Sequence, residues 1–414
     1  MNHRIIVAIV LLTFFVISFI TNTLGPIFPA LIESFDIGLL VAGFFPFAFF
    51  VAYGVMSIPA GILVHQQGEK VTMLLAFSLA AVGALLFAVV PSFMTAMVSL
   101  FLIGCSMSLL QVAINPLLRR SGGGQHFAVY SVAAQLLFGL GGALSPWVYS
   151  TFEQQIANQS GIGRAFIQMV PDNMSWLSMY WLFAMISVVM LALIMLVRIE
   201  RGQQQSTEAF STHLVLMKSP VVIKFFLAIA AYVFVEQGVA NSMIVFLEKY
   251  HGVEPVQQGS AIVSQFWLNL TLGCILGLIL LKFVDAKLVL LGFSSGAIIC
   301  LLLALFSSSQ VALVAFPAVG FFLSVMWSVL FSLALNSVRE HHGSFSGILC
   351  TGIVGGALAS PAVGLFSELF SSMQLGMFIL FIPLVYIFSV GLWAKPLIKN
   401  DLIRFNRKQS TQNV

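Results

Sequence analysis

Long apolar segments separated by short polar ones occupy almost the whole 414-residue chain. Each segment holds about 20 or more residues, the length that a helix needs to cross the hydrocarbon core of a bilayer. Hydrophobic residues make up 60% of the sequence and charged residues 8%, whereas a soluble domain carries about 25% charged residues. Such a chain cannot cover a water-exposed surface. This excludes a disordered protein, a nucleic-acid-binding domain and a large soluble enzyme.

Gly, Pro and charged residues divide the sequence into twelve apolar segments. They are residues 5–31, 38–64, 71–90, 93–118, 127–150, 176–198, 220–247, 258–282, 287–307, 310–337, 344–367 and 372–395. Hydrophobicity does not alternate with a period of two inside them, so helices are favoured over a β-barrel. We therefore predict an all-α integral membrane protein with twelve transmembrane helices.

The basic residues predict the orientation of these helices. With the N-terminus in the cytoplasm, sixteen of the eighteen Lys and Arg residues fall in cytoplasmic segments, and only Arg164 and Lys249 fall outside. This is the distribution that the positive-inside rule requires. Both termini are then cytoplasmic. We expect a multi-pass protein of the plasma membrane, which in a bacterium is the inner membrane. The expected partner is the lipid bilayer, and no nucleic-acid partner is expected.

Three sequence similarities recur six segments apart. Gly139–Pro146 resembles Gly352–Pro361, the loop at 61–70 resembles that at 277–287, and Glu33 corresponds to Glu248. Such repeats indicate two parallel six-helix bundles with a binding site between them, near the middle of the membrane. The predicted units are residues 1–198, a linker at 199–219, residues 220–398 and a tail at 399–414. We expect the protein to be a monomer.

Glycine clusters in the fifth and eleventh segments are candidates for gating. Small residues let helix backbones approach closely, and Pro interrupts a helix. The gating candidates are Gly139, Gly141, Gly142, Gly355 and Gly356. Tight helix packing without a role in gating is the alternative interpretation.

One acidic residue, Glu236, lies well inside a predicted span. A charged group at the bilayer centre costs about 2.5–3.5 kcal/mol even on the lenient insertion scale, and it commonly marks a functional site. Glu236 is therefore a candidate for binding a substrate hydroxyl, a proton or Na⁺. The alternative is a structural carboxyl that is hydrogen-bonded to neighbouring helices.

Amides and aromatic rings accompany this carboxyl in the spans. Gln111 with Asn115, Gln237 with Asn241, and Gln265 with Asn269 are pairs one helical turn apart. Amides donate and accept hydrogen bonds, as a neutral polyol requires, and aromatic faces suit the apolar face of a sugar ring. The predicted binding residues are Asn22, Tyr53, Gln111, Asn115, Gln135, Glu236, Gln237, Asn241, Gln265, Trp267, Asn269 and Trp327. Hydrogen bonding between helices is the alternative for each amide.

The sequence resembles the major facilitator superfamily, and within it the fucose permease and glucose/galactose permease branch. The resemblance rests on Tyr53 with Ile58–Leu63, Gln111–Pro116, Ala134–Gln135, Tyr232–Glu236, Phe266–Trp267, Phe331–Leu335 and Gly355–Glu368. It implies cation-coupled import of a hexose-like sugar by alternating access.

The resemblance also implies where coupling takes place. The positions that are acidic in the fucose permease match Gln111 and Gly25 here, and neither can bind a proton. Coupling to Na⁺ or H⁺ is therefore expected at Glu236. No cofactor is expected, and the one candidate metal is Na⁺ near Glu236.

Other functions remain open at this point. An exporter of amphipathic drugs, or a transporter of another small polar solute, would have the same fold. A membrane sensor without transport is a third alternative. An intramembrane enzyme is disfavoured, because the Gly292–Gly296 match to GxSxG lies in an apolar segment and no His lies deep in any span.

Overall fold

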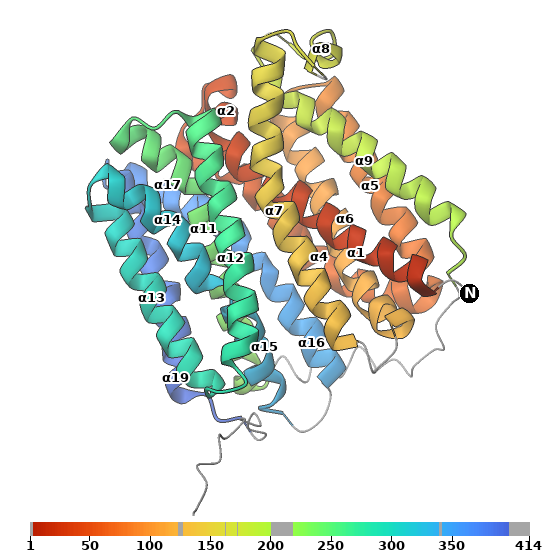
Figure 1. The fold of residues 1–414 in the computed structure, drawn as a ribbon, viewed down its shortest axis with the longest axis vertical. Helices are drawn as coiled ribbons and strands as arrows, with labels where there is room; N and C mark the ends of the chain where they lie inside the picture. Colours follow the sequence, from red (N-terminus) through yellow and green to blue (C-terminus); the bar gives the residue numbers. More distant parts are fainter. Residues whose placement is uncertain are drawn as a thin grey trace, which may run out of the picture.

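The computed structural model describes residues 3–122, 127–161, 163–171, 173–199, 218–338 and 342–396, almost all of them helical. Within these residues, eleven segments are long and apolar enough to cross a membrane. The remaining predicted span, 127–150, lies inside the 31-residue helix α7 (Figure 1). The prediction of an all-α membrane protein is confirmed. The predicted linker and the predicted tail lie almost entirely outside the described residues.

The N-terminal half comprises the elements up to α9. They are α1 (His3–Asn22), α2 (Leu24–Phe35), α3 (Leu39–Ala42), α4 (Phe44–Gln67), α5 (Glu69–Val89), α6 (Phe93–Gly122), α7 (Phe127–Ala157), α8 (Gly163–Phe166), η1 (Ser175–Leu177) and α9 (Ser178–Leu196). Helices α1 and α2 together form the first span, which is interrupted at Thr23, and α3 and α4 form the second, interrupted at Gly43.

The C-terminal half comprises the elements from α11 onward. They are α11 (Pro220–His251), the π-helical turn η2 (Pro255–Gly259), α12 (Ser260–Leu280), α13 (Ala286–Phe306), α14 (Ser309–Leu323), α15 (Met326–Leu335), α16 (His342–Thr351), η3 (Gly352–Val354), α17 (Gly355–Leu369), α18 (Met373–Gly376), η4 (Met377–Leu380) and α19 (Phe381–Trp393). Helices α14 and α15 are two parts of one span, Ser309–Leu335.

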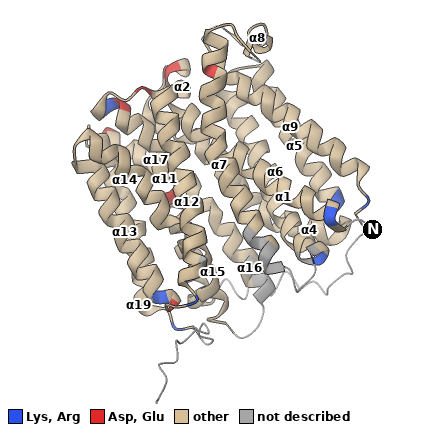
Figure 2. Cartoon of the chain, in the orientation of Figure 1, with Lys and Arg blue, Asp and Glu red and all other residues tan. Residues whose placement is uncertain are grey.

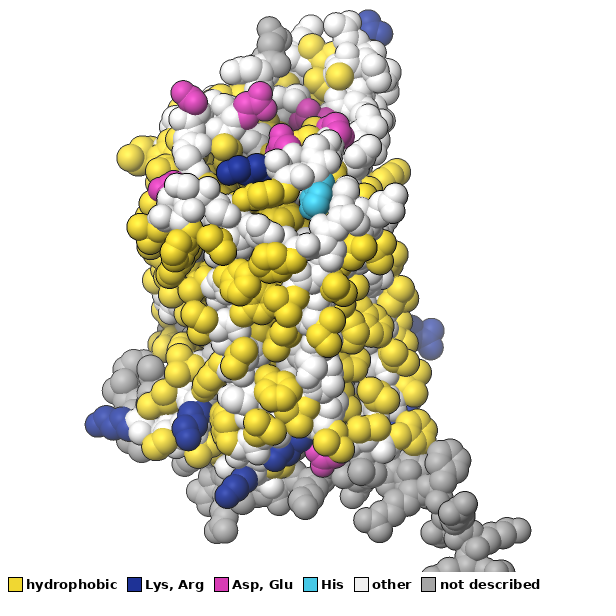
Figure 3. Space-filling view, turned by 90° about the vertical axis from the view of Figure 1, so that its left-hand side faces the viewer, with side chains coloured by type: hydrophobic (Ala, Val, Ile, Leu, Met, Phe, Trp, Pro, Cys, Tyr) yellow, Lys and Arg dark blue, Asp and Glu magenta, His cyan; other side chains and the backbone are white. Residues whose placement is uncertain are grey.

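Charged side chains other than Glu236 gather at the two ends of the molecule and leave an apolar belt between them (Figures 2 and 3). We call one end the acidic end; it holds Glu33, Asp36, Glu153, Glu248, Glu254 and Glu368. We call the other the basic end; it holds Arg4, Lys70, Arg120, Lys218 and Lys282. By the positive-inside rule, the basic end faces the cytoplasm.

The two halves meet along three pairs of segments. Helix α7 packs on α12, α17 packs on α3 and α4, and α2 crosses α11. At the last crossing, a Cβ on Gly25 would lie 2.9 Å from the carbonyl oxygen of Ala240. These two residues are 215 positions apart, as are Glu33 and Glu248, and Pro146 and Pro361. Gly25 and Ala240, which are equivalent positions of the two sequence repeats, therefore meet where the halves cross, as a pseudo-twofold arrangement requires.

Each half also fixes its fifth span to its first by a serine that precedes a proline. Ser145 hydrogen-bonds to the hydroxyl of Thr23 in the N-terminal half. In the C-terminal half, Asn241 Nδ2 donates to Ser360 Oγ at 3.3 Å. Corresponding helices of the two sequence repeats are thus joined by a hydrogen bond in each half.

Candidate functional site

The central carboxyl, Glu236, lies on α11 and is half-buried. The hydroxyl of Tyr232, one helical turn earlier, donates to Oε1 at 2.6 Å, and Nε2 of Gln237 lies 3.5 Å from Oε2. The ion pair found among the described residues joins other side chains, Glu69 and Arg120. Glu236 is therefore held by neutral donors, one of which is a phenol.

A cavity of about 420 Å³ lies between the two halves. This volume is in the range of small-molecule sites. Gln135 of α7 forms one side, and the other side is formed by Trp327, Ser328, Phe331, Ser332, Leu335 and Asn336. Gln135 lies near the start of α7, and Asn336 directly follows α15, so the cavity is displaced toward the basic end.

The α15 wall of this cavity is amphipathic. Ser328, Ser332 and Asn336 follow one another at intervals of four residues, and Asn336 Nδ2 lies 3.5 Å from Ser332 Oγ. Trp327 and Phe331 form a second stripe beside them, with stacked rings 6.0 Å apart. Residues four apart lie on one helix face. The wall therefore offers hydroxyl and amide groups next to aromatic faces, the combination that a sugar ring can use.

The aromatic stripe leads from the cavity to the carboxyl. The ring of Trp327 lies 6.0 Å from the ring of Tyr232, whose hydroxyl bonds to Glu236. Tyr232 itself is 4% exposed. A contact on the cavity face of Trp327 is thus two side chains away from the carboxylate.

Three other predicted residues form a small group on the N-terminal half. Gln111 Nε2 donates to the hydroxyl of Tyr53 at 3.3 Å, and Asn115 Nδ2 donates to the backbone carbonyl of Gln111 at 2.9 Å. Tyr53 is buried and stacks on Phe50, whereas Asn115 is exposed. The predicted pairing of Gln111 with Asn115 is present in this geometry.

Several predicted binding residues are packed between helices in this conformation. Asn22, Gln237, Asn241 and Trp267 are buried. Among the residues that the structure describes, Oδ1 of Asn22 and Nε1 of Trp267 find no hydrogen-bond partner. Both side chains lie against Gly142, where the halves meet. Their role in binding remains a prediction, and it would require the halves to separate here.

Gln265 differs from the other predicted residues. It is exposed on α12 in line with Leu268 and Leu272, which are also exposed. This spacing forms one outward stripe of the helix, and such an apolar stripe is typical of lipid contact. Asn269 is half-buried beside this stripe. Gln265 is not among the described residues that line the cavity, and its role in binding remains a prediction.

The candidate gating glycines fall into two groups. Cβ atoms on Gly139, Gly142 and Gly356 would meet Thr271, Trp267 and Phe50 of the opposite half. Cβ atoms on Gly141 and Gly355 would meet backbone atoms of their own halves, at Phe15 and Ala230. In this conformation the second pair of glycines packs within one bundle, and a gating role remains a prediction for all five glycines.

Two further glycines, absent from the sequence-based set, close the acidic end. A Cβ on Gly43 would lie 2.6 Å from the backbone nitrogen of Pro361, and one on Gly364 would lie 2.6 Å from Cα of Leu40. Real Cβ atoms are essentially never so close to a backbone atom of another helix. The acidic end is shut by backbone packing, whereas the cavity lies toward the basic end.

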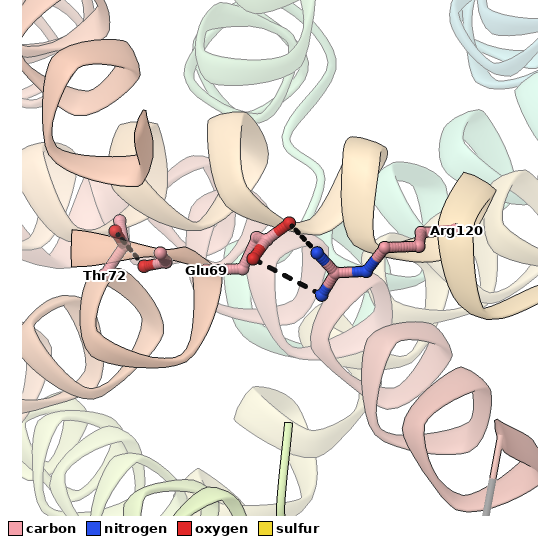
Figure 4. A network of polar contacts seen from close by, with 4 residues as sticks. Glu69, Thr72 and Arg120 are labelled. Atoms are coloured by element: carbon pink, nitrogen blue, oxygen red, sulfur yellow. Dashed lines mark hydrogen bonds and ion pairs between the residues drawn. The ribbon is translucent and has the colours of Figure 1, made fainter. Parts of the chain in front are cut away.

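Polar contacts at the basic end tie helices within the N-terminal half (Figure 4). Arg120 Nη1 and Glu69 Oε1 lie 3.0 Å apart, and Nη2 and Oε2 lie 3.4 Å apart. Lys70 Nζ donates to the carbonyls of Met195 and Val197 at the end of α9. Helices α5, α6 and α9 are thereby joined as one body.

This arrangement, two six-helix halves around a cavity, agrees with comparison to known proteins. Residues 10–361 match the family model of the Major Facilitator Superfamily. The chain belongs to this superfamily. The family consists of transporters, so the enzyme alternative is excluded and the predicted resemblance is confirmed.

Curated relatives within the superfamily are distant but cover most of the chain. A protein named glucose/galactose transporter from Brucella abortus biovar 1 (strain 9-941) is 26% identical over 382 residues, 89% of each chain. The L-fucose-proton symporter of Escherichia coli (strain K12) is 24% identical over 374 residues, 84% of each chain.

Solved structures of the superfamily share the fold. The outward conformation of the E. coli fucose:proton symporter superposes with a TM-score of 0.68 at 20% identity, covering 95% of this chain and all of the other. An inward-facing bacterial homologue of the human lysosomal transporter Spinster gives 0.74 at 13% identity, covering 94% and 97%.

Proposed function

We propose that this superfamily member imports a hexose-like sugar by alternating access and couples the import to a cation at Glu236. The observation that carries the proposal is the amphipathic α15 wall, where the Ser328–Ser332–Asn336 stripe runs beside Trp327 and Phe331 in a cavity of about 420 Å³. The names of the curated relatives, a glucose/galactose transporter and an L-fucose-proton symporter, support the same substrate class.

The conformation supports the proposed transport cycle. Gly43 and Gly364 pack on the opposite half at the acidic end, and the cavity lies toward the basic end. With the basic end in the cytoplasm, this is the inward-open state. Import then requires a second state, in which the acidic end opens and the cavity closes toward the cytoplasm.

We infer that the coupling ion is a proton. Oε1 of Glu236 already accepts the hydroxyl hydrogen of Tyr232, and Gln237 approaches Oε2. A hard metal cation prefers several oxygen ligands around it, whereas both oxygens of Glu236 already face hydrogen-bond donors. A carboxyl in a neutral hydrogen-bonded setting needs no such ligands to bind a proton.

Counterflow in proteoliposomes tests the substrate class without any assumption about the ion. Vesicles loaded with unlabelled D-glucose, D-galactose or L-fucose should take up the same labelled sugar transiently, and mannitol-loaded vesicles should not. Counterflow of none of the three sugars by folded protein would reject the proposal. The same vesicles should then be tested with an amphipathic dye, because an aromatic cavity with one carboxyl nearby also fits a drug exporter.

A further inference from the structure

The deep carboxyl and the sugar-facing wall are connected by one side chain, Tyr232. Its hydroxyl donates to Glu236 Oε1 at 2.6 Å, and its ring lies 6.0 Å from that of Trp327, with an angle of 57° between the ring planes. Trp327 lines the cavity and is half-buried, whereas Tyr232 is 4% exposed. A ligand that moves Trp327 therefore also acts on a neighbouring ring that is almost completely enclosed by protein.

We propose that Tyr232 is the positioning residue that links sugar occupancy to proton binding: a sugar seated on Trp327 turns the Tyr232 hydroxyl away from Glu236. The inference rests on the proposed function. Loss of a donor leaves the carboxylate less stabilised relative to the neutral carboxyl, so Glu236 then holds a proton more firmly. By linkage, a protonated Glu236 must raise the affinity for sugar by the same factor.

Among the groups around Glu236, Tyr232 is the one able to make proton binding at Glu236 depend on sugar occupancy. The other titratable side chain that interacts with Glu236 within the described residues is Cys274 of α12, whose Sγ donates to the carbonyl of Ser324 at 3.2 Å. A thiol is neutral over the acidic and neutral range in which a carboxyl titrates. Trp327 brings no charge from α15, and the described Lys and Arg residues on neighbouring elements lie toward the ends of the molecule.

The size of the expected coupling follows from the bond that is lost. Loss of a hydrogen bond to a charged group changes an equilibrium constant by about 10- to 100-fold. Sugar affinity should therefore be about 10- to 100-fold higher when Glu236 is protonated than when it is ionised. In Tyr232→Phe, which keeps the ring and lacks the donor, the two affinities should agree within about twofold.

The experiment measures proton uptake when sugar is added to purified protein in lightly buffered detergent with a pH indicator. The probes are D-glucose, D-galactose and L-fucose, and sugar binding is measured in parallel by calorimetry at several pH values. Wild type should take up protons with the sugar that it binds. Tyr232→Phe should bind that sugar without proton uptake. The control is Tyr386→Phe. It loses a hydroxyl that donates to the backbone carbonyl of Lys224, a residue of α11 like Tyr232, and it should behave as wild type.

The outcomes separate this inference from the proposed function. If wild type binds none of the sugars, the proposed function fails. If wild type takes up protons with sugar and Tyr232→Phe does so equally, Tyr232 has only a structural role and the inference is overturned. If Tyr232→Phe binds no sugar, Trp327→Leu decides, because it removes the cavity contact and keeps the Tyr232–Glu236 bond. Undiminished proton uptake per bound sugar in Trp327→Leu would also overturn the inference.

Discussion

The backbone N–H of Leu40 donates a hydrogen bond to Oε1 of Glu368 at 3.3 Å and thereby joins the two halves at the acidic end. Leu40 belongs to the first turn of α3, whose N-cap, Gly38, has no side chain to satisfy the free N–H groups of that turn. Glu368 of α17 supplies the missing acceptor from the opposite half. The bond exists only while the acidic end is closed, so it contributes to the free-energy difference between the two transport states.

Replacing Glu368 should therefore shift this equilibrium toward the state that is open at the acidic end. An exposed hydrogen bond of this kind is worth about 0.5–1.5 kcal/mol, which corresponds to roughly a 2- to 10-fold change in population for Glu368→Ala. Spin labels on Gln154→Cys and Gln258→Cys, with the four native cysteines replaced, report the distance across the acidic end. Glu368→Gln keeps an acceptor and should give a smaller shift, and an unchanged distance distribution in Glu368→Ala would contradict this role.

Adding a methyl group at Gly43 or Gly364 should prevent the acidic end from closing. Each new Cβ would lie 2.6 Å from a backbone atom of the other half, which cannot move aside as a flexible side chain can. Gly43→Ala and Gly364→Ala should fold but lose net uptake by more than tenfold, and the same spin labels should show the open distance. Gly292→Ala is the matched control, because a Cβ there meets nothing within 4 Å. Normal uptake by both interface variants would refute closure through these glycines.

Gln135 and Gln265 were both predicted from the sequence to bind substrate, but they differ in their position relative to the cavity. Gln135 lines the cavity, and Gln265 is exposed beside Leu268 and Leu272. Gln135→Ala should raise the KM for sugar counterflow by about 3- to 10-fold, the cost of one hydrogen bond, and Ser332→Ala should act in the same direction. Gln265→Ala should change KM by less than about twofold. The reverse order of the two glutamine variants would show that the substrate binds along α12.

A half-buried carboxyl at the acidic end, that of Glu153, should make stability depend on pH. Burial raises the pKa of Glu153 above its usual range, and donation from Ser175 Oγ at 2.5 Å opposes this shift in part. The folded state therefore resists ionisation, so the stability that neutral Glu153 provides at low pH is lost as pH rises through the raised pKa. Glu153→Gln should raise the melting temperature in detergent by on the order of 1 °C or more at pH 8, and by less at pH 5. Equal effects at both pH values would contradict this assignment.

The sequence predicted the spans well because each span is determined locally. Twenty apolar residues bounded by Gly, Pro or a charge have few alternatives to a membrane helix, and all twelve predicted spans are helices. The repeat was also readable, since Ser145–Pro146 and Ser360–Pro361 stand at equal offsets in the two halves. The regular spacing of Ser328, Ser332 and Asn336 was available in the same way, and it could have identified the α15 wall.

The site itself depends on information that a single sequence lacks. Gln135 and Gln265 have similar local sequence surroundings, and only the packing of whole helices decides which one faces the cavity. The contacts of Gly43 with Pro361 and of Leu40 with Glu368 join residues more than 300 positions apart and exist in one conformational state. Asn22 and Trp267 are likewise buried by a contact between distant segments, since both lie against Gly142 of α7.

The coupling role of Glu236 is tested most directly by accumulation of a labelled hexose in proteoliposomes, with a proton gradient or a Na⁺ gradient imposed separately. We predict that wild type accumulates one of D-glucose, D-galactose and L-fucose under the proton gradient and not under the Na⁺ gradient. Glu236→Gln should lose this accumulation and retain counterflow of the same sugar. Accumulation by Glu236→Gln at the wild-type level, or accumulation driven by Na⁺ alone, would contradict proton coupling through Glu236.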